Sequence, residues 1–317
     1  MSVRIFVTLS AFSQYDDAPI RLLERSGIPF DLNRSGKRIT RDELMNAAQR
    51  ATVVIAGVEP YDAAVLDSLP ALRCISRCGV GVDSIDLEHA HRRGITVLNT
   101  PDPPAQAVAE LALAMMLALA RNLPVQAAHM RRREWTRVDA HLLGKRRVGV
   151  VGLGRIGRRV VELLTPFGSP VCAADPNADV SWAAAHGVRI APLDELLATS
   201  DIVTLHAAAQ RRDALRLDRA ALARMRQGAI LLNLARGGMV DEAALEEALA
   251  SGHLSGAGLD VYSEEPYSGP LCDRDNVILT PHAATLTVET RTAMEIECVQ
   301  NALAFISGAR FSSDAIA

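Results

Sequence analysis

The amino-acid sequence predicts an α/β protein built from two doubly wound parallel sheets. Short apolar runs rich in β-branched residues recur along the chain, and stretches with helical periodicity separate them. Because these runs are apolar on both faces, they are typical of parallel strands that helices cover on two sides. The 317 residues, 49% of them hydrophobic, suffice for two domains that each bury a core.

The predicted elements fall into two groups on either side of a proline-rich break at Pro101, Pro103 and Pro104. We therefore expect a domain boundary near residue 99. A long helix rich in Ala, Leu and Met is predicted directly after the break. The predicted strands are residues 5–7, 53–56, 95–98, 148–151, 170–174, 202–205, 230–235, 256–261 and 277–279, and the predicted helices include 105–121, 155–167 and 242–251.

The composition argues against several classes of partner. The net charge is only −3, so neither nucleic acid nor an anionic membrane is expected to bind. The most apolar segment, 111–120, is too short to span a bilayer, and the first residues show no signal-peptide pattern. The five scattered cysteines indicate reduced thiols, a cytoplasmic location and no zinc site. The polar segment 131–135 is expected to form a surface arm or a subunit contact.

The strongest local signal is a G-x-G-x-x-G pattern formed by Gly152, Gly154 and Gly157. It follows a predicted strand and opens a predicted helix. The first glycine allows a tight turn, the second lets backbone approach a pyrophosphate, and the third lets the helix pack close to the strand. The helix N-terminus offers free N–H groups and a positive dipole to phosphates. The pattern therefore predicts a dinucleotide site.

An acidic residue ends the next predicted strand. The carboxylate of Asp175 can accept hydrogen bonds from both ribose hydroxyls of NAD, and it repels the extra phosphate of NADP. Pro176 and Asn177 follow, so no arginine is present there to hold that phosphate. We therefore expect NAD rather than NADP as the cofactor.

Three polar side chains follow the ends of the last predicted strands. Arg236 follows 230–235, Glu265 follows 256–261 and His282 follows 277–279. Taken singly, Arg236 reads equally well as a salt bridge at a strand end and the histidine as a structural residue. Together at one sheet edge they predict hydride transfer to a keto acid, because Arg binds a carboxylate, His acts as acid or base, and Glu orients the imidazole and favours imidazolium.

At these residues the sequence resembles the D-isomer-specific 2-hydroxyacid dehydrogenase family, and most closely its phosphoglycerate dehydrogenase-like members. The resemblance covers nearly the whole chain. It is carried by Gly79-Val80-Gly81-Val82-Asp83, Asn99-Thr100-Pro101, Val108-Ala109-Glu110, Leu143-Gly144-Lys145, the glycine loop, Asn233-Leu234-Ala235-Arg236-Gly237-Gly238, Asp260-Val261 with Glu265-Pro266, and Thr280-Pro281-His282.

The resemblance implies a Rossmann NAD-binding domain at 99–287 and a discontinuous flavodoxin-like substrate domain at 1–98 and 288–317. It also implies a homodimer built through the cofactor domain. Arg236 matches the substrate-carboxylate arginine, His282 the acid/base and Glu265 its partner. The remaining implied contacts are Arg155 and Ile156 at the pyrophosphate, His206 and Ala207 beside the adenosine, Asp260 at the nicotinamide carboxamide, Leu234, Ala235, Ala283 and Ala284 along the nicotinamide, and Val80 and Gly81 at the substrate carboxylate.

Two departures from the family pattern and several alternatives stay open. Pro104 stands where phosphoglycerate dehydrogenases often have Asn, and Ala208 replaces a loop proline. Glyoxylate, hydroxypyruvate, 3-phosphoglycerate and bulkier 2-keto acids are candidate substrates. One alternative is an NAD-sensing corepressor of the same fold, although the intact catalytic set argues against it. Another is a phosphite dehydrogenase-like enzyme, whereas Glu265 argues against formate enzymes, which have Gln there.

Overall fold

The computed structural model describes residues 3–207, 215–309, 311 and 316. The chain divides into two compact units, Met1–Pro104 with Leu286–Ala317, and Ala105–Thr285. The units thus change over at 104/105 and 285/286, whereas the sequence predicts boundaries at 98/99 and 287/288. The difference at the first boundary is the proline-rich break, which belongs with the first unit. Ala208, one of the two departures, lies outside the described residues.

The first unit is a five-stranded parallel sheet in the order β2-β1-β3-β4-β5, with helices on both faces. Alternate strand residues enter two separate cores, one shared with α1 and α12 and the other with α2, α3 and α4. The strands are β1 Ile5–Val7, β2 Phe30–Leu32, β3 Val53–Ala56, β4 Cys74–Arg77 and β5 Thr96–Leu98. The helices are α1 Ala18–Ser26, α2 Arg41–Ala47, α3 Ala63–Ser68, α4 Leu87–Arg92 and α12 Val288–Ser307.

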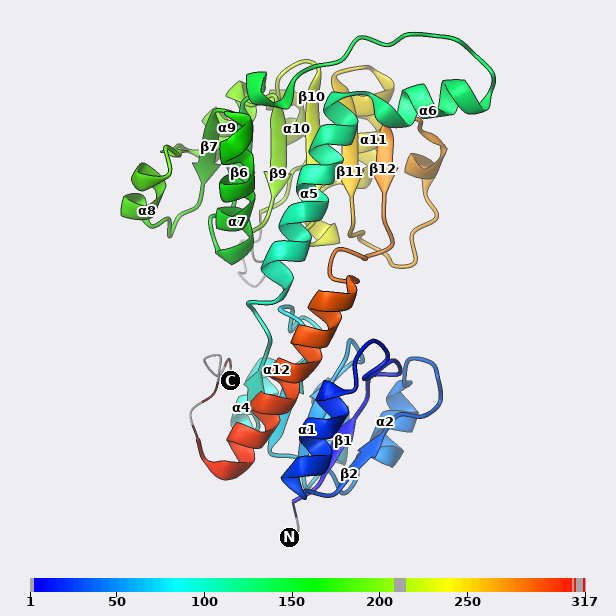
Figure 1. Cartoon of the computed structure of the whole chain (residues 1–317), viewed down its shortest axis with the longest axis vertical. Coiled ribbons are helices and arrows are strands. Elements are labelled where there is room, and N and C mark those ends of the chain that lie inside the picture. The colour runs from blue at the N-terminus through cyan, green and yellow to red at the C-terminus, as the bar shows by residue number, and fades with distance from the viewer. Residues whose placement is uncertain (1–2, 208–214, 310, 312–315, 317) are drawn as a thin grey trace. The chain divides into compact units, whose positions relative to one another are not determined.

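The second unit is a seven-stranded parallel sheet in the order β12-β11-β10-β9-β6-β7-β8 (Figure 1). One core packs against α5 and α7, and the other packs against α9, α10 and α11. The strands are β6 Val148–Val151, β7 Val171–Ala174, β8 Arg189–Ile190, β9 Ile202–Leu205, β10 Ala229–Asn233, β11 Leu254–Leu259 and β12 Val277–Leu279. The helices are α5 Pro104–Ala120, α6 Leu123–Arg131, α7 Arg155–Leu164, α8 Val180–Ala185, α9 Leu193–Thr199, α10 Arg219–Arg224 and α11 Glu242–Ala250.

Three predicted boundaries are wrong in instructive ways. The helix predicted at 155–167 ends at Leu164 and continues as a 3-10 turn, Thr165–Phe167, because Pro166 has no N–H to extend the α-helix. The strand predicted at 230–235 ends at Asn233, where the asparagine side chain bonds the following turn. The strand predicted at 256–261 is Leu254–Leu259, so Asp260 follows the strand instead of lying within it.

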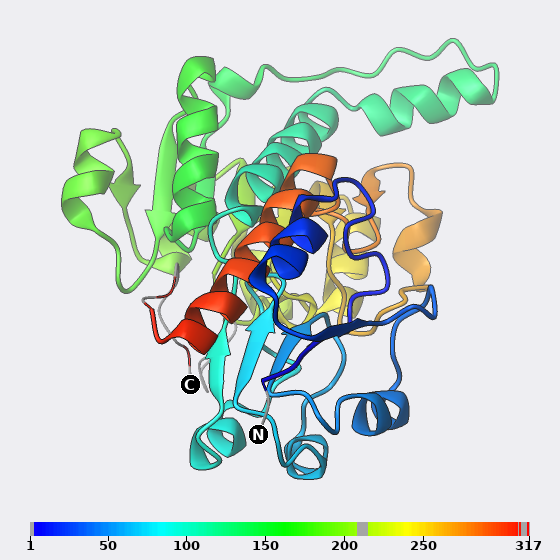
Figure 2. The same cartoon turned by 60° about the horizontal axis from the view of Figure 1, so that its bottom comes forward.

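An arm leaves the second unit after α5. Helix α6 runs away from the sheet, and the segment that follows it leads back to the second unit, so that residues 121–142 form the arm in both views (Figures 1 and 2). The apolar side chains along this arm are exposed: Leu123 by 52%, Met130 by 56%, Trp135 by 81% and Leu142 by 67%. Taken alone, no helix of the described residues has both the length and the apolar character to cross a membrane; α5 and α6 meet that test only as a pair, bent by 62°.

Candidate functional site

The glycine loop occupies the turn between β6 and α7, as the sequence predicts. Gly152 has a φ of +93°, and a Cβ on it would stand 2.6 Å from the Ala207 nitrogen. A Cβ on Gly157 would collide with the carbonyl oxygen of Gly152. A Cβ on Gly154 would instead meet no atom within 4 Å. The first and third glycines therefore permit close packing, while the second leaves open the space at the N-terminus of α7, where Arg155 is exposed and Ile156 is half-buried.

This loop lies where the strand order of the second unit reverses. From β6 the chain runs to β7 and β8 on one side, and from β9 to β10, β11 and β12 on the other. In open parallel sheets, ligands bind outside the carboxyl ends of the strands at such a switch point. Gly152 follows β6 and His206 with Ala207 follows β9, so the two loops that flank the switch point pack on each other.

Asp175 directly follows β7 and is tied to the glycine loop. Its Oδ2 accepts a hydrogen bond from the Leu153 N–H at 2.7 Å, and its Oδ1 accepts one from the Asn177 N–H at 2.7 Å. An ionised carboxylate has about four acceptor positions, so both oxygens can still accept from hydroxyl groups. The position and chemistry of Asp175 fit a ribose.

Arg158 braces the same loop, although the sequence alone did not single it out. Its Nε donates to the Leu153 carbonyl at 3.2 Å, and its guanidinium lies 4.9 Å from the ring centre of Trp182. The tryptophan in turn stacks on His186. Arg158, which belongs to α7, therefore holds the glycine loop at Leu153. This role also depends on Trp182, which is distant in the sequence.

His206 is buried at its ring nitrogens beside the switch point. Its Nε2 is 2.8 Å from Thr204 Oγ1, and its Nδ1 is sealed from solvent with no hydrogen-bond partner among the described residues. Burial lowers the pKa of His206 to about 3, because the charged ring would lose its hydration. The ring is therefore neutral at physiological pH.

Arg236 lies in a turn that Asn233 holds from the end of β10. The Asn233 side chain donates to the Arg236 carbonyl at 2.8 Å and accepts from the Ala235 N–H at 3.1 Å. The Arg236 guanidinium donates to the Ala235 carbonyl at 2.7 Å and is half-buried, whereas Leu234 and Ala235 are buried. Because a Cβ on Gly237 would collide with the Tyr262 carbonyl, this turn packs directly on the loop after β11.

Asp260 joins the loop after β11 to the loop after β12. It is 1% exposed. Its Oδ1 accepts from Thr280 Oγ1 at 2.6 Å and from the Ala283 N–H at 2.7 Å, and its Oδ2 accepts from the Ala284 N–H at 3.0 Å. The carboxylate therefore fixes the backbone of Ala283 and Ala284, for which the family resemblance implies a place along the nicotinamide.

Glu265 and His282 form a hydrogen-bonded pair in the loops after β11 and β12. The His282 Nδ1 is 3.0 Å from Oε2 and 3.2 Å from Oε1 of Glu265, and Glu265 Oε1 also accepts from the Tyr262 N–H at 3.2 Å. Since a carboxylate only accepts, Nδ1 carries the proton in this contact. No described residue bonds Nε2, and the His282 side chain is 54% exposed, so Nε2 is available for proton transfer.

The structure thus brings the predicted catalytic set onto adjoining loops. Arg236, Glu265 and His282 follow β10, β11 and β12, which are neighbours in the sheet. Direct contacts connect these loops, through Gly237 against Tyr262 and through Asp260 to Ala283. A cation, an acid or base, and a carboxylate that orients it are the groups that reduction of a keto acid requires.

Val80 and Gly81 lie in the first unit, after β4. Gly79, which precedes them, has a φ of +135° and donates from its N–H to Thr100 Oγ1 at 2.8 Å. The Asn99 side chain donates to the Val80 carbonyl at 2.8 Å. This loop is therefore pinned by residues that follow β5, and the side chain of Val80 is left exposed.

The second unit matches a known protein family. Residues 113–284 match the family described as D-isomer specific 2-hydroxyacid dehydrogenase, NAD binding domain. The chain is 37% identical over 281 residues to the D-3-phosphoglycerate dehydrogenase of Mycobacterium tuberculosis, an alignment that covers 87% of this chain and 53% of the relative. The chain therefore spans about half the length of the curated relatives it matches.

Solved structures share the fold over their whole length. A protein from Thermus thermophilus is 35% identical, has a TM-score of 0.86, and aligns over 99% of this chain and 100% of its own. The D-lactate dehydrogenase of Aquifex aeolicus, solved with NAD and lactic acid, is 27% identical with a TM-score of 0.84 and covers 96% of each chain. On the match of its larger unit and on its identity to these relatives, the chain belongs to the D-isomer specific 2-hydroxyacid dehydrogenase family.

Proposed function

We propose that this chain is an NAD-dependent oxidoreductase that moves a hydride between the cofactor and a small 2-hydroxy or 2-keto acid, with D specificity. The observation that carries the proposal is the Glu265–His282 pair, which leaves Nε2 of the imidazole available at the same sheet edge as Arg236. A corepressor that only senses the cofactor has no need for a polarised acid/base of this kind.

The cofactor is proposed to bind at the switch point of the second sheet. Gly152, Gly154 and Gly157, with Arg155 and Ile156, would hold the pyrophosphate. Asp175 would hold the ribose, and His206 with Ala207 would border the adenosine. Asp260 would position Leu234, Ala235, Ala283 and Ala284 along the nicotinamide. When bound, the nicotinamide supplies or accepts the hydride.

The remaining chemistry is assigned to side chains of this protein. In reduction, His282 donates the Nε2 proton to the developing alkoxide, and in oxidation the neutral ring removes the hydroxyl proton. Glu265 holds the ring in the Nδ1-protonated form and stabilises the imidazolium. Arg236 binds the substrate carboxylate as a charged hydrogen-bond donor, and the backbone N–H groups of Val80 and Gly81 are proposed to bind the same carboxylate.

We also propose a cytoplasmic homodimer that binds neither nucleic acid nor membrane. The near-neutral net charge of −3 supports the absence of polyanionic partners. The exposed apolar side chains of the arm support a second copy of the chain as its partner, because isolated proteins rarely expose a row of large apolar groups.

A steady-state screen of 2-keto acids with NADH tests the proposal. We expect turnover of at least one acid, and we expect His282→Ala to lower kcat by about 10²–10⁴-fold while NADH affinity is unchanged, because the ring moves a proton and does not hold the cofactor. His91→Ala, which alters an exposed histidine of α4, is the matched control and should keep full activity.

Three outcomes contradict the proposal in different ways. Tight NADH binding without turnover of any acid would favour the cofactor-sensing alternative. Phosphite oxidation with NAD, in place of keto-acid reduction, would favour a phosphite dehydrogenase-like enzyme. Full activity of His282→Ala would remove this histidine from the mechanism.

A further inference from the structure

The sheet of the first unit has a switch point of its own. Its strand order is β2-β1-β3-β4-β5. The chain therefore places β2 on one side of β1 and then crosses to the other side, where β3, β4 and β5 follow. Thr8 directly follows β1, and Glu59 lies in the loop after β3. Since ligands of parallel sheets bind beyond the strand ends at such a point, the residues placed there face a binding position.

Glu59 is held at this switch point by one of its two oxygens. The residue is 2% exposed. Its Oε1 accepts from the Gly57 N–H at 2.9 Å and from the Tyr61 hydroxyl at 2.9 Å, and the Thr8 hydroxyl also bonds it. Tyr61 is fully buried, and burial next to Glu59 raises the pKa of its phenol, so the hydroxyl keeps its proton and donates. The carboxyl group is therefore fixed as an acceptor that bridges the ends of β1 and β3.

The second oxygen of Glu59 has no hydrogen-bond partner among the described residues. No described residue bonds Glu59 Oε2, and this oxygen is not among the sealed side-chain atoms that lack a partner, so the surface reaches it. It lies 2.8 Å from the point where a Cβ on Gly57 would stand. The absence of a side chain at residue 57 therefore keeps this oxygen open. Leaving an acceptor oxygen of a nearly buried carboxylate without a hydrogen bond costs free energy, so a donor is expected at Oε2.

Glu59 lies next to the predicted binding site of the substrate carboxylate, which suggests that the donor to its Oε2 belongs to the substrate. Val80 and Gly81 follow β4, which pairs directly with β3, and neighbouring strands lie about 4.8 Å apart. If a 2-keto acid binds with its carboxylate at Val80 and Gly81 and its far end on the side of β3, that end meets the loop that holds Glu59. Two arginines lie nearby. Arg38, which precedes α2, donates to the Val58 carbonyl, and Arg77, the last residue of β4, donates to the Cys78 carbonyl. Their positive charges favour the carboxylate of the substrate, whereas the negative charge of Glu59 disfavours a second anionic group, such as a phosphate, at the far end of the same substrate.

We infer that Glu59 is a specificity-determining residue, which accepts a hydrogen bond from a hydroxyl group on the carbon next to the keto group of the substrate. The inference rests on the proposed function. It predicts that the protein prefers 3-hydroxy-2-keto acids to acids that carry a methyl or a phosphate group in place of this hydroxyl. A site built to bond a hydroxyl rejects an analogue that lacks it, because the buried acceptor is then left unpaired.

Two acids of nearly the same shape test the inference. Hydroxypyruvate and 2-oxobutyrate differ by a hydroxyl in place of a methyl, so the ratio of their kcat/KM values measures the hydrogen bond itself. We expect the wild-type protein to favour hydroxypyruvate by at least about tenfold. Glu59→Gln keeps an acceptor for Thr8, Gly57 and Tyr61 but presents an NH₂ group to the substrate, so the ratio should fall at least about tenfold. Phosphohydroxypyruvate should be used better by this variant than by the wild type.

Gly57→Ala is an independent second variant. It keeps the carboxylate but places a methyl group against Oε2, and it should lower the same ratio. Glu24→Gln, an isosteric change on the exposed face of α1, is the matched control and should leave the ratio unchanged. A variant that is only less well folded loses activity on both acids alike, so the ratio separates a specificity role from a structural one.

The outcomes separate this inference from the function on which it rests. If the wild type reduces 2-keto acids but the ratio stays the same in Glu59→Gln and Gly57→Ala, the role of Glu59 is wrong and the proposed function stands. A wild-type preference for 2-oxobutyrate or phosphohydroxypyruvate would also overturn the inference alone. If no 2-keto acid is reduced, the proposed function fails and the assignment of Glu59 fails with it.

Discussion

His206 illustrates how a single buried ring couples the fold to pH. The residue is only partly buried, yet its Nδ1 is sealed from solvent, so the ring titrates as a buried group with a pKa of about 3. In the unfolded chain a histidine has a pKa of about 6.5. Between these two values the unfolded state binds a proton that the folded state excludes. Folding stability therefore decreases as the pH falls below about 6.5, and the loss is complete near pH 3.

We predict that His206 makes the wild-type protein lose about 1–2 kcal/mol more stability between pH 7 and pH 5 than a His206→Gln variant does. The comparison between the two proteins cancels the contribution of the other titrating groups. Urea unfolding at both pH values measures the effect. Equal losses in the two proteins would show that the ring is protonated in the folded state.

Single residues also show what sequence reasoning can and cannot reach. Arg236, Glu265 and His282 could be predicted because each follows a strand end, and the topology of parallel strands places strand ends on one edge. Glu59 could not be singled out, and Asn233 entered only as part of a family motif with no role of its own, because both act through hydrogen bonds whose partners are set by the fold. Asp260 was predicted as a cofactor contact, and the structure adds that its carboxylate holds the neighbouring loop through three hydrogen bonds.

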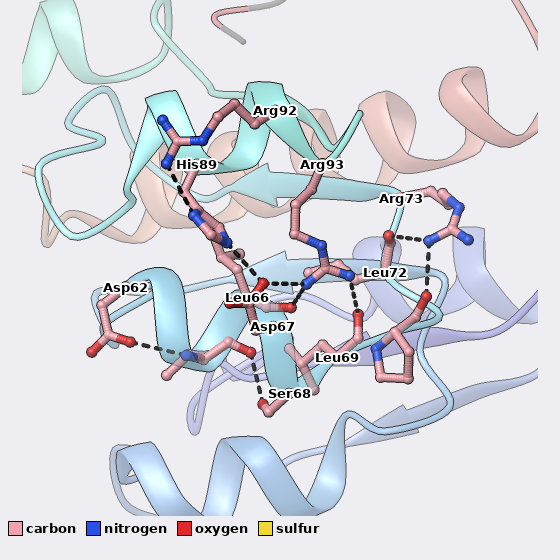
Figure 3. Close-up of polar contacts among 12 residues, drawn as sticks. Asp62, Leu66, Asp67, Ser68, Leu69, Leu72, Arg73, His89, Arg92 and Arg93 are labelled. Carbon is pink, nitrogen blue, oxygen red and sulfur yellow. Dashed lines mark hydrogen bonds and ion pairs between the residues drawn. The ribbon is translucent and has the colours of Figure 1, made fainter.

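Helices α3 and α4 show how a connection between elements depends on one arginine. Figure 3 shows Arg93, which follows α4, reaching the carbonyl groups at the C-terminal end of α3. Its guanidinium donates to the Leu66 carbonyl and, at 3.4 Å, to the Leu69 carbonyl, and it pairs with Asp67 at 3.4 Å. A cation at a helix C-terminus satisfies carbonyls that lack a partner within the helix and interacts favourably with its dipole.

We predict that Arg93→Ala lowers the free energy of unfolding by about 1–2 kcal/mol, because it removes charged hydrogen bonds to carbonyls at the end of α3 and the favourable interaction of the cation with the helix dipole. Arg92→Ala is the matched control on the same helix. The Arg92 side chain is 56% exposed and pairs with Glu88 and His89 at the surface, so its loss should cost much less. Urea denaturation of both variants measures the difference, and equal losses would show that the carbonyl contacts do not stabilise the connection.

At the same scale, the strands that escaped prediction have identifiable causes. β4 has the sequence Cys-Ile-Ser-Arg, and its polar residues interrupt the apolar pattern typical of a buried strand. The Ser76 hydroxyl is nevertheless buried, because it donates to the Cys298 carbonyl of α12. β8 has only two residues, and β2 alternates between an exposed Asp31 and half-buried neighbours. The apolar strands and the helices α5 and α11 were predictable from the residues, because their burial produces a continuous or periodic apolar pattern.

At the scale of the whole molecule, the arm carries large apolar side chains that the rest of the chain does not cover. Trp135 is 81% exposed and Met130 is 56% exposed. Met130 belongs to α6 and Trp135 to the segment that follows it, which together form the arm seen in Figure 2. An aromatic side chain of this size buries about 150–250 Å² when it is covered, and tryptophan is among the residues that dominate binding energies. If the arm packs against a second copy of the chain, Trp135 is expected to contribute about 2 kcal/mol or more to dimerisation.

We predict that the wild-type protein is a dimer in solution and that Trp135→Ala raises the dimer dissociation constant by about 30-fold or more. Light scattering coupled to size exclusion over a range of concentrations measures this, since the chain has a mass of 34.0 kDa. Val180→Ser, which alters an exposed apolar residue of α8, is the control and should leave the dimer intact. A wild-type monomer at all concentrations would contradict the dimer itself. A dimer that tolerates Trp135→Ala would place the interface elsewhere, because a large apolar group at the centre of an interface cannot be removed without loss of affinity.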